Sequence, residues 1–123
     1  MSKTRKIIGW VLTALLAFAF ISSGIMKFMA TPEILAKAAT WGITASTIKI
    51  IATIEILSAL IFIIPRTGIV GTLLLAAYMG GAIATHIEHN DNVMVPIVLE
   101  SLIWITALLR FPELGSRLSG SKK

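Results

Sequence analysis

Four ionisable side chains interrupt the long apolar stretches of this sequence: Lys27, Glu55, His86 and Glu100. A charged group at the depth of a lipid bilayer is costly and generally faces a partner or a wet cavity. A lysine, an imidazole and two carboxylates brought together there could bind the polar head of a small molecule or move protons. They could also form a buried ion-pair network that only stabilises the fold. Both interpretations stay open at this point.

The composition excludes several classes of protein. Hydrophobic residues make up 56% of the 123 residues and charged residues 14%, whereas soluble domains carry about 25% charged residues. The chain has no cysteine, which excludes disulfides, thiolate metal sites and thiol redox catalysis, so redox chemistry would need a bound cofactor. The net charge of +5 does not indicate nucleic-acid binding, which requires a basic face on a polar domain, because the basic residues here lie between apolar runs. We expect a lipid bilayer as partner and no nucleic acid.

The apolar runs themselves predict membrane spans. Residues 7–26 and 67–85 are uncharged, and each run is long enough to cross a hydrocarbon core of about 30 Å as a helix. Residues 47–64 and 92–109 would be equally clear without Lys49, Glu55 and Glu100. The sequence therefore predicts an all-α integral membrane four-helix bundle, a single transmembrane domain over residues 1–123. Its helices are expected at about 7–27, 47–64, 68–87 and 93–110.

The first run has an alternative interpretation, a cleaved signal peptide, because Lys3, Arg5 and Lys6 precede it. Its apolar stretch is too long for a signal peptide, and the small residues near its end lead directly into Ile25 and Met26 without a good cleavage pattern. We favour a retained helix.

The distribution of Lys and Arg predicts the orientation. With the N-terminus inside, eight of the 11 basic residues lie on the cytoplasmic side, where positive flanks are retained during insertion. These are Lys3, Arg5, Lys6, Arg66, Arg110, Arg117, Lys122 and Lys123, while Lys27, Lys37 and Lys49 lie outside. We expect a multi-pass protein of the cell inner (plasma) membrane with both termini cytoplasmic.

The outer connection between the first two spans contains signals for a short interfacial helix at about 32–41. Thr31 can cap it, Pro32 suits its first position and Glu33 complements its positive end. Gly42 can end it, and Trp41 fits a headgroup anchor.

The depths of the ionisable residues predict one cluster. Glu55 and Glu100 each lie roughly 10 to 12 Å below the outer surface at helical rise, and Lys27 and His86 end their helices at the outer rim. The four side chains can therefore converge in the outer half of the bundle, whereas the inner half has no charged or titratable group. Two aromatic residues could extend the site, since Tyr78 is mid-span and Trp104 follows Glu100 by one turn. The spacing of His86 and His89 is poor evidence for a metal, and no metal site is predicted.

Small residues in the third span indicate close helix packing. Two adjacent ladders of small residues repeat every four residues, about one helical turn, and let another backbone approach. The first ladder is Thr72, Ala76, Gly80 and Ala84, and the second is Ala77, Gly81 and Thr85.

The order and spacing of several short motifs resemble the DoxX-like family of small four-helix membrane proteins. They are Ser23-Gly24-Ile25-Met26-Lys27-Phe28, Ile54-Glu55-Ile56-Leu57 followed by Pro65-Arg66, Ala77-Tyr78-Met79 to Ala84-Thr85-His86, and Trp104 before Arg110. The resemblance implies the four-helix fold and places Lys27, Glu55 and His86 on recurrent polar positions of the family. It also implies a link to quinone or redox complexes, so quinone enters as a candidate cofactor by resemblance only.

The expected function is that of an inner-membrane protein with an outward-facing buried polar site. It would serve as an accessory subunit of a quinone- or redox-linked membrane complex, or bind a small lipophilic ligand. The alternative is a non-catalytic scaffold or assembly factor, whose small-residue ladders bind a membrane protein partner or a second copy. We do not expect the chain alone to be an enzyme. A proton or solute path is disfavoured, because no titratable group continues the route toward the cytoplasm.

Overall fold

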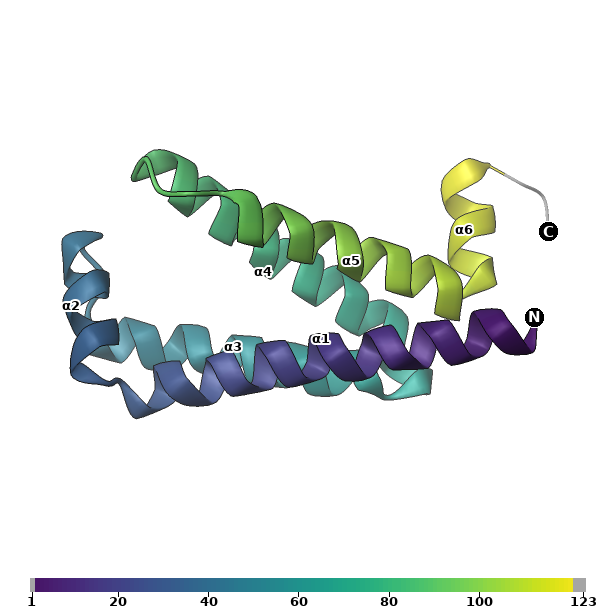
Figure 1. Ribbon diagram of the computed structural model, residues 1–123, viewed down its shortest axis with the longest axis horizontal. Helices are drawn as coiled ribbons and strands as arrows, with labels where there is room; N and C mark the ends of the chain where they lie inside the picture. The colour runs from purple at the N-terminus through teal and green to yellow at the C-terminus, as the bar shows by residue number, and fades with distance from the viewer. Residues whose placement is uncertain (1, 121–123) are drawn as a thin grey trace.

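The computed structural model describes residues 2–120, and every regular element in that range is helical (Figure 1). The helices are α1 (Lys3–Met29), α2 (Pro32–Thr40), α3 (Ala45–Ile63), the 3-10 turn η1 (Pro65–Thr67), α4 (Gly68–Glu88), α5 (Met94–Arg110) and α6 (Pro112–Ser119). Lys122 and Lys123, which enter the charge count for the orientation, lie outside the described residues.

Three of these helices, α1, α3 and α4, are long and apolar enough to cross a membrane. The shorter α5 meets that condition only together with α6, and the path of the chain bends by 108° between the two helices. Residues 2–120 therefore contain three candidate spans, or four if the bent pair is one span. That α5 crosses the bilayer, and that both termini are cytoplasmic, stay predictions.

Local capping explains where the first helices begin and end. The Ser2 hydroxyl accepts a hydrogen bond from the Arg5 amide at 3.1 Å, so α1 begins four residues before the apolar run that predicted it. Ala30 ends α1 in the left-handed region at φ 53°. Thr31 then caps α2 by accepting from the Ile34 amide, with Pro32 at the first helical position. The segment predicted at 32–41 is thus helical over Pro32–Thr40.

The sequence analysis did not predict α6. Pro112 disfavours helical backbone at the residue before it, and Phe111 lies at φ −123°, ψ 87°, outside the helical region. Pro112 also lacks an amide hydrogen, which makes it suitable as the first residue of a new helix. The chain therefore turns at Phe111 and starts again.

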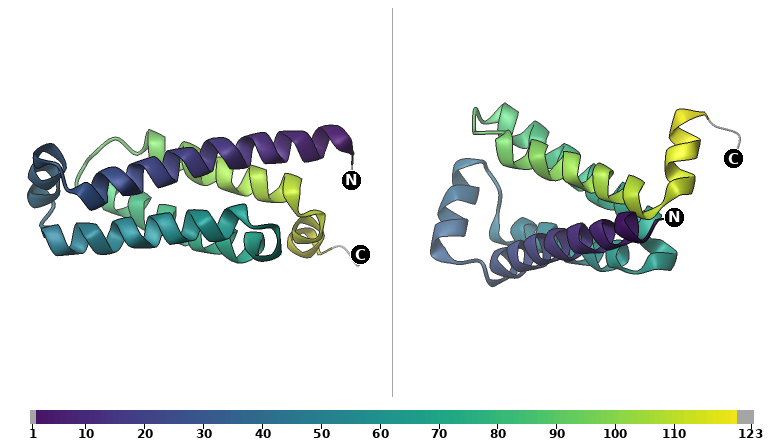
Figure 2. Two further views of the ribbon diagram at one scale, coloured as in Figure 1. Left: turned by 90° about the horizontal axis from the view of Figure 1, so that it is seen from below. Right: turned by 45° about the vertical axis from the view of Figure 1, so that its right-hand side comes forward.

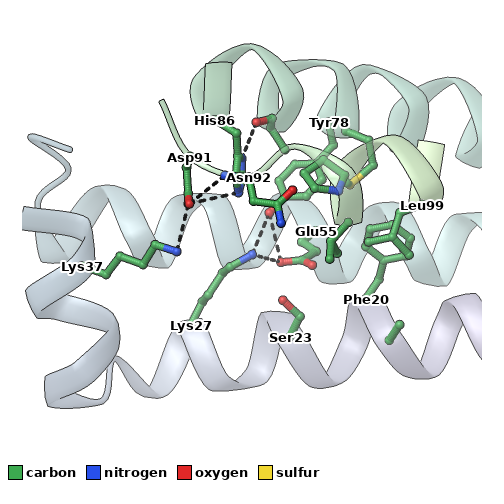
Figure 3. Close-up of a pocket in the computed structure, with 15 residues that line it drawn as sticks. Phe20, Ser23, Lys27, Lys37, Glu55, Tyr78, His86, Asp91, Asn92 and Leu99 are labelled. Atoms are coloured by element: carbon green, nitrogen blue, oxygen red, sulfur yellow. Dashed lines mark hydrogen bonds and ion pairs between the residues drawn. The ribbon is translucent and has the colours of Figure 1, made fainter. Parts of the chain in front are cut away.

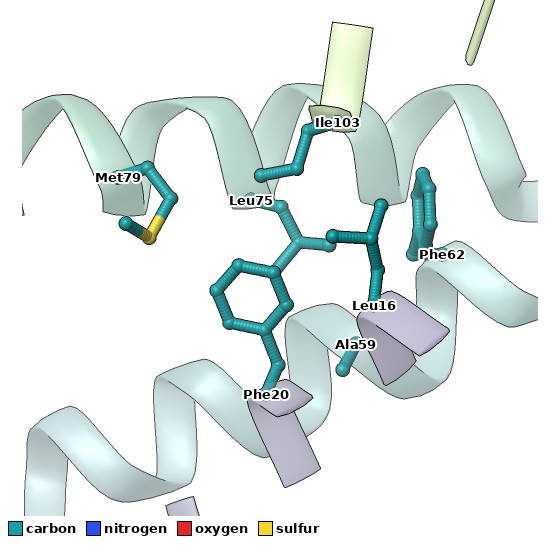
Figure 4. Packing of buried hydrophobic residues seen from close by; sticks show 7 residues of the cluster. All are labelled: Leu16, Phe20, Ala59, Phe62, Leu75, Met79 and Ile103. Atoms are coloured by element: carbon teal, nitrogen blue, oxygen red, sulfur yellow. The ribbon is translucent and has the colours of Figure 1, made fainter. Parts of the chain in front are cut away.

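The four long helices pack around one apolar core. α1 contacts α3 and α5, and α4 contacts the same two helices. The core residues come from all four helices (Figure 4): Leu16, Phe20, Ala59, Phe62, Leu75, Met79 and Ile103. Toward the end that carries α2, the α1–α3 pair and the α4–α5 pair splay apart (Figures 1 and 2). The outer faces of these helices expose large apolar side chains, such as Phe18 at 76%, as expected of a surface in contact with lipid.

Glycine allows the closest helix contact on α4. A Cβ added at Gly71 would lie 2.3 Å from the backbone of Phe62 on α3. The predicted ladder is distributed differently: Thr72 is fully buried, Ala76 is half-buried, and Gly80 and Ala84 are exposed. The tight intrachain contact of α4 therefore lies at Gly71, one residue before that ladder.

A buried arginine closes the end of the bundle opposite α2. Arg110 is 9% exposed and donates hydrogen bonds to the carbonyl oxygens of Phe62 (2.7 Å) and Ile63 (3.1 Å). These carbonyls end α3 and have no partner within the helix. The guanidinium also lies 4.7 Å from the ring centroid of Trp10. Arg110, which the sequence analysis counts only as a basic residue flanking the last span, is thus buried on the carbonyls that end α3.

We predict that Gly71→Ala lowers the free energy of unfolding by about 1 to 3 kcal/mol, because the added methyl group overpacks a backbone contact. The matched control is Gly81→Ala, since no atom of the described residues lies within 4 Å of a Cβ built there. That control should change stability by less than about 1 kcal/mol. Thermal unfolding in detergent measures both, and equal melting temperatures would contradict the proposed contact.

Candidate functional site

Three side chains from three helices form a hydrogen-bonded triad at the splayed end of the bundle (Figure 3). Lys27 is in the last turn of α1, Glu55 in the middle of α3 and Tyr78 in the middle of α4. The Lys27 Nζ donates to Glu55 Oε1 at 3.0 Å and to the Tyr78 hydroxyl at 3.1 Å. The Tyr78 hydroxyl donates to the same Glu55 oxygen at 3.1 Å. We call these three residues the polar triad.

The triad satisfies a carboxylate that is removed from solvent. The Glu55 side chain is 3% exposed and the Lys27 side chain 30%. A buried carboxylate needs a counter-charge and hydrogen-bond donors close by, and Lys27 supplies the charge while Tyr78 supplies a second donor. The ammonium group has three donors, of which two go to Glu55 and Tyr78. Among the described residues, the third donor has no hydrogen-bond partner.

Two cavities meet at the triad. The smaller, of about 370 Å³, lies among α1, α4, α5 and the loop that follows α4, with Lys37 of α2 and Glu55 of α3 also in its wall. The larger, of about 910 Å³, is lined by α1, α2, α3 and α4. Six residues line both and form their common wall: Ser23, Lys27, Lys37, Tyr78, Ala82 and His86. The larger volume is in the range of cavities that enclose small organic ligands.

The remaining predicted site residues lie in different places. His86 lines both cavities, but its Nδ1 lies 2.6 Å from the Ala82 carbonyl oxygen, a contact within α4. Neither cavity is lined by Glu100 or Trp104. Glu100 instead approaches α4, where its Oε2 lies 3.8 Å from a Cβ built on Gly80. Its Oε1 is buried without a hydrogen-bond partner among residues 2–120.

The structure thus brings together Lys27, Glu55 and Tyr78, with His86 beside them, and leaves Glu100 out. The depth of Glu100 along its helix predicted that it lies near the other three residues. In the structure, the face of α5 that carries Glu100 is turned toward the seam between α4 and α5. The four-residue convergence expected from depth alone does not include Glu100.

A second group of contacts, which the sequence reading did not find, joins α2 to the end of α4 and the following loop. Lys37 Nζ lies 3.2 Å from Asp91 Oδ2. The Trp41 ring stacks on His89 at 4.8 Å and meets His86 edge-on at 5.1 Å. We call Lys37, Trp41, His86, His89 and Asp91 the clasp. The signal for it in the sequence is weak: Lys37 and Trp41 lie one turn apart on one helix face.

Asp91 is held in its charged form. The Asn92 backbone amide, at 2.8 Å from Oδ1, and the Lys37 ammonium keep the pKa of Asp91 below its usual value. A folded-state pKa below that of the unfolded chain stabilises the fold above the unfolded-state pKa, and this contribution is lost as the pH falls through the folded-state value. The Lys37–Asp91 pair therefore weakens only in acid, below roughly pH 4.

Among the described residues, no group of three or more His, Cys, Asp or Glu side chains is arranged to hold a metal ion. The chemistry available at the triad is hydrogen bonding and charge, supplied by an ammonium, a carboxylate and a phenol.

Comparison with known proteins gives one match. A model of the DoxX-like family matches residues 11–106, a stretch that contains the polar triad and His86. No curated protein and no solved structure matches.

We predict that Lys27→Met lowers the free energy of unfolding by about 3 kcal/mol or more, because it leaves the Glu55 carboxylate buried without its cation. Adding Glu55→Gln to that variant should restore most of the loss, since the orphaned charge is then removed. Glu100→Gln is the control, because it removes a carboxylate outside the triad, and its free energy of unfolding should be close to that of the wild type. Thermal unfolding of the single and double variants tests this, and additive losses would contradict an ion pair.

Proposed function

The chain belongs to the DoxX-like family, and from this premise we propose that it binds a small lipophilic molecule in the membrane. The observation that carries the proposal is that two members of the polar triad, Lys27 and Tyr78, lie in the wall of the larger cavity, while Glu55, to which both are hydrogen-bonded, lines the smaller one. The polar head of the ligand would lie beside Lys27 and its apolar part in the larger cavity. This site would lie in the outer half of an inner-membrane protein.

The lining supports a lipophilic ligand. Most side chains around the larger cavity are apolar and come from four different helices, among them Ile34, Ile51, Ile54 and Leu74. A few converging polar groups in an apolar cavity are typical of sites that orient a small molecule. Gly81 also lines this cavity, and a Cβ built on it meets no atom of the described chain within 4 Å. The space beside α4 is therefore open.

The triad favours a ligand whose head accepts hydrogen bonds. The third donor of the Lys27 ammonium can form a charge-assisted hydrogen bond, which is stronger than one between neutral groups. A carbonyl or carboxylate oxygen is a suitable acceptor. Quinones carry such carbonyls, and an accessory role in a quinone- or redox-linked complex rests on the family resemblance alone.

The arrangement of the chain ends supports the proposed orientation. The start of α1 and the whole of α6 lie at one end of the molecule, and α2 lies at the other (Figure 1). If α1, α3, α4 and α5 each cross the bilayer, the end with α1's start carries Lys3, Lys6 and Arg66, which the positive-inside rule places in the cytoplasm. The triad then opens to the outer side.

One observation favours the alternative of a membrane scaffold. Glu100 has a buried oxygen without a hydrogen-bond partner in the described part of the chain, and the neighbouring Gly80 is exposed. A helix of a membrane partner, or of a second copy, could approach at Gly80 and donate a hydrogen bond to Glu100.

Adjacent glycines on α4 separate the two functions. We predict that Gly81→Leu fills the larger cavity and abolishes ligand retention without unfolding, while Gly80→Leu, which lines neither cavity, retains the ligand. Native mass spectrometry with extraction of bound lipids from gently purified protein measures retention, and thermal unfolding verifies the fold. Glu55→Gln and Glu100→Gln form a second matched pair, in which only the first should lose the ligand.

An empty wild-type protein would contradict the binding proposal, and so would a ligand that Gly81→Leu retains. The scaffold alternative predicts the opposite dependence. Gly80→Leu would then disrupt a complex seen by native mass spectrometry, and Gly81→Leu would leave it intact.

A further inference from the structure

We propose that α2 is a lid over the two cavities, held closed by the clasp. The lid rests on the proposed function in that it would control exchange of the bound molecule. The lid can also be tested without a ligand, because its opening and closing change the access of water to the cavity wall whether or not a molecule is bound.

The position of α2 supports a lid. Its residues Ile34, Lys37 and Ala38, with Trp41 at its end, line the larger cavity, and Lys37 also lines the smaller one. In Figure 1, α2 lies across the end of the molecule where the two helix pairs splay apart. The helix therefore covers the end at which the cavities would otherwise meet the outer surface.

The attachment of α2 to the bundle is light. Of its residues, Ala38 is the one that is buried, so little apolar surface holds the helix down. Both of its ends are left-handed turns, at Ala30 with φ 53° and at Gly42 with φ 73°. Segments with few buried contacts open at a low cost in free energy. The two turns separate α2 from α1 and α3, so that α2 can move as a unit relative to them.

The clasp crosses from α2 to the opposite helix pair. The Lys37–Asp91 ion pair is 3.2 Å long, with side-chain exposures of 64% and 34%. An exposed ion pair adds little to stability, so it can break and form again. The Trp41 ring adds contacts to both histidines of the α4 end. Together these contacts favour the closed lid without making it permanent.

The absence of cysteine in the chain allows a direct test that needs no ligand. Ser23→Cys places one thiol of nearly the same size in the common wall of the cavities. Full-length protein in nanodiscs is treated with a charged, water-soluble methanethiosulfonate reagent, and the rate of modification is measured by mass spectrometry. Ser46→Cys, exposed at the start of α3, is the control outside the cavities.

We predict that adding Lys37→Asp raises the modification rate of the cavity thiol by about fivefold. The substitution places two negative charges at the clasp, and a change of about fivefold is the shift expected when an exposed ion pair at the upper end of the usual range of strength is lost. Adding Asp91→Lys to that variant reverses the pair and should restore the slow rate. The rate at the Ser46→Cys control should not change in either background.

Three results would overturn the lid. The cavity thiol could react at the same rate with and without Lys37→Asp, the reversed pair could fail to restore the slow rate, or the control thiol could accelerate in parallel, which would indicate unfolding of that end. Failure of ligand retention in native mass spectrometry would overturn the proposed function and leave these rates unchanged, so the two proposals fail separately.

Discussion

A carboxylate in the apolar interior of a membrane protein needs partners close enough to offset its lost hydration. Glu55 on α3 meets this need through Lys27 of α1 and Tyr78 of α4, so one charged group fixes how three helices lie against each other. A shift of α1 by one residue would separate the ammonium from the carboxylate. The position of the C-terminal end of α1 therefore depends on the triad as well as on apolar packing.

The two ends of the bundle are built on different physical principles. At the end of α5, Arg110 satisfies the last carbonyls of α3, and Gly71 lets α4 contact the α3 backbone. At the opposite end the helix pairs splay, and the polar triad with the clasp takes the place of apolar contact. Close packing at one end supports the fold and leaves the other end free to enclose space, which is the usual division between a rigid scaffold and a binding site.

Glu55 and Glu100 show why depth in the bilayer does not identify a site. The sequence predicts similar depths for the two carboxylates, yet Glu55 is paired and lines a cavity, while Glu100 lies on the α4–α5 seam with one oxygen that has no hydrogen-bond partner among residues 2–120. The difference comes from the rotation of α5 about its own axis. Family membership, shown by the match over residues 11–106, is compatible with ligand binding and with scaffolding. The two carboxylates distinguish these functions physically, because a bound ligand would depend on Glu55 and a partner helix on Glu100.

The sequence by itself determined α2 and the four long helices, the apolar runs and the residues that need partners, because backbone hydrogen bonding, capping and hydrophobic length are local properties. Thr31, Pro32 and Trp41 were enough to predict α2, and Lys27 and Glu55 were enough to predict that polar side chains from different helices meet. Only the tertiary structure decided which groups meet: the exclusion of Glu100, the contact of Lys37 with Asp91, and the burial of Arg110 on α3. These contacts depend on the rotation and crossing of whole helices, which are set by side-chain packing between segments far apart in the chain and leave no periodic signal in the sequence.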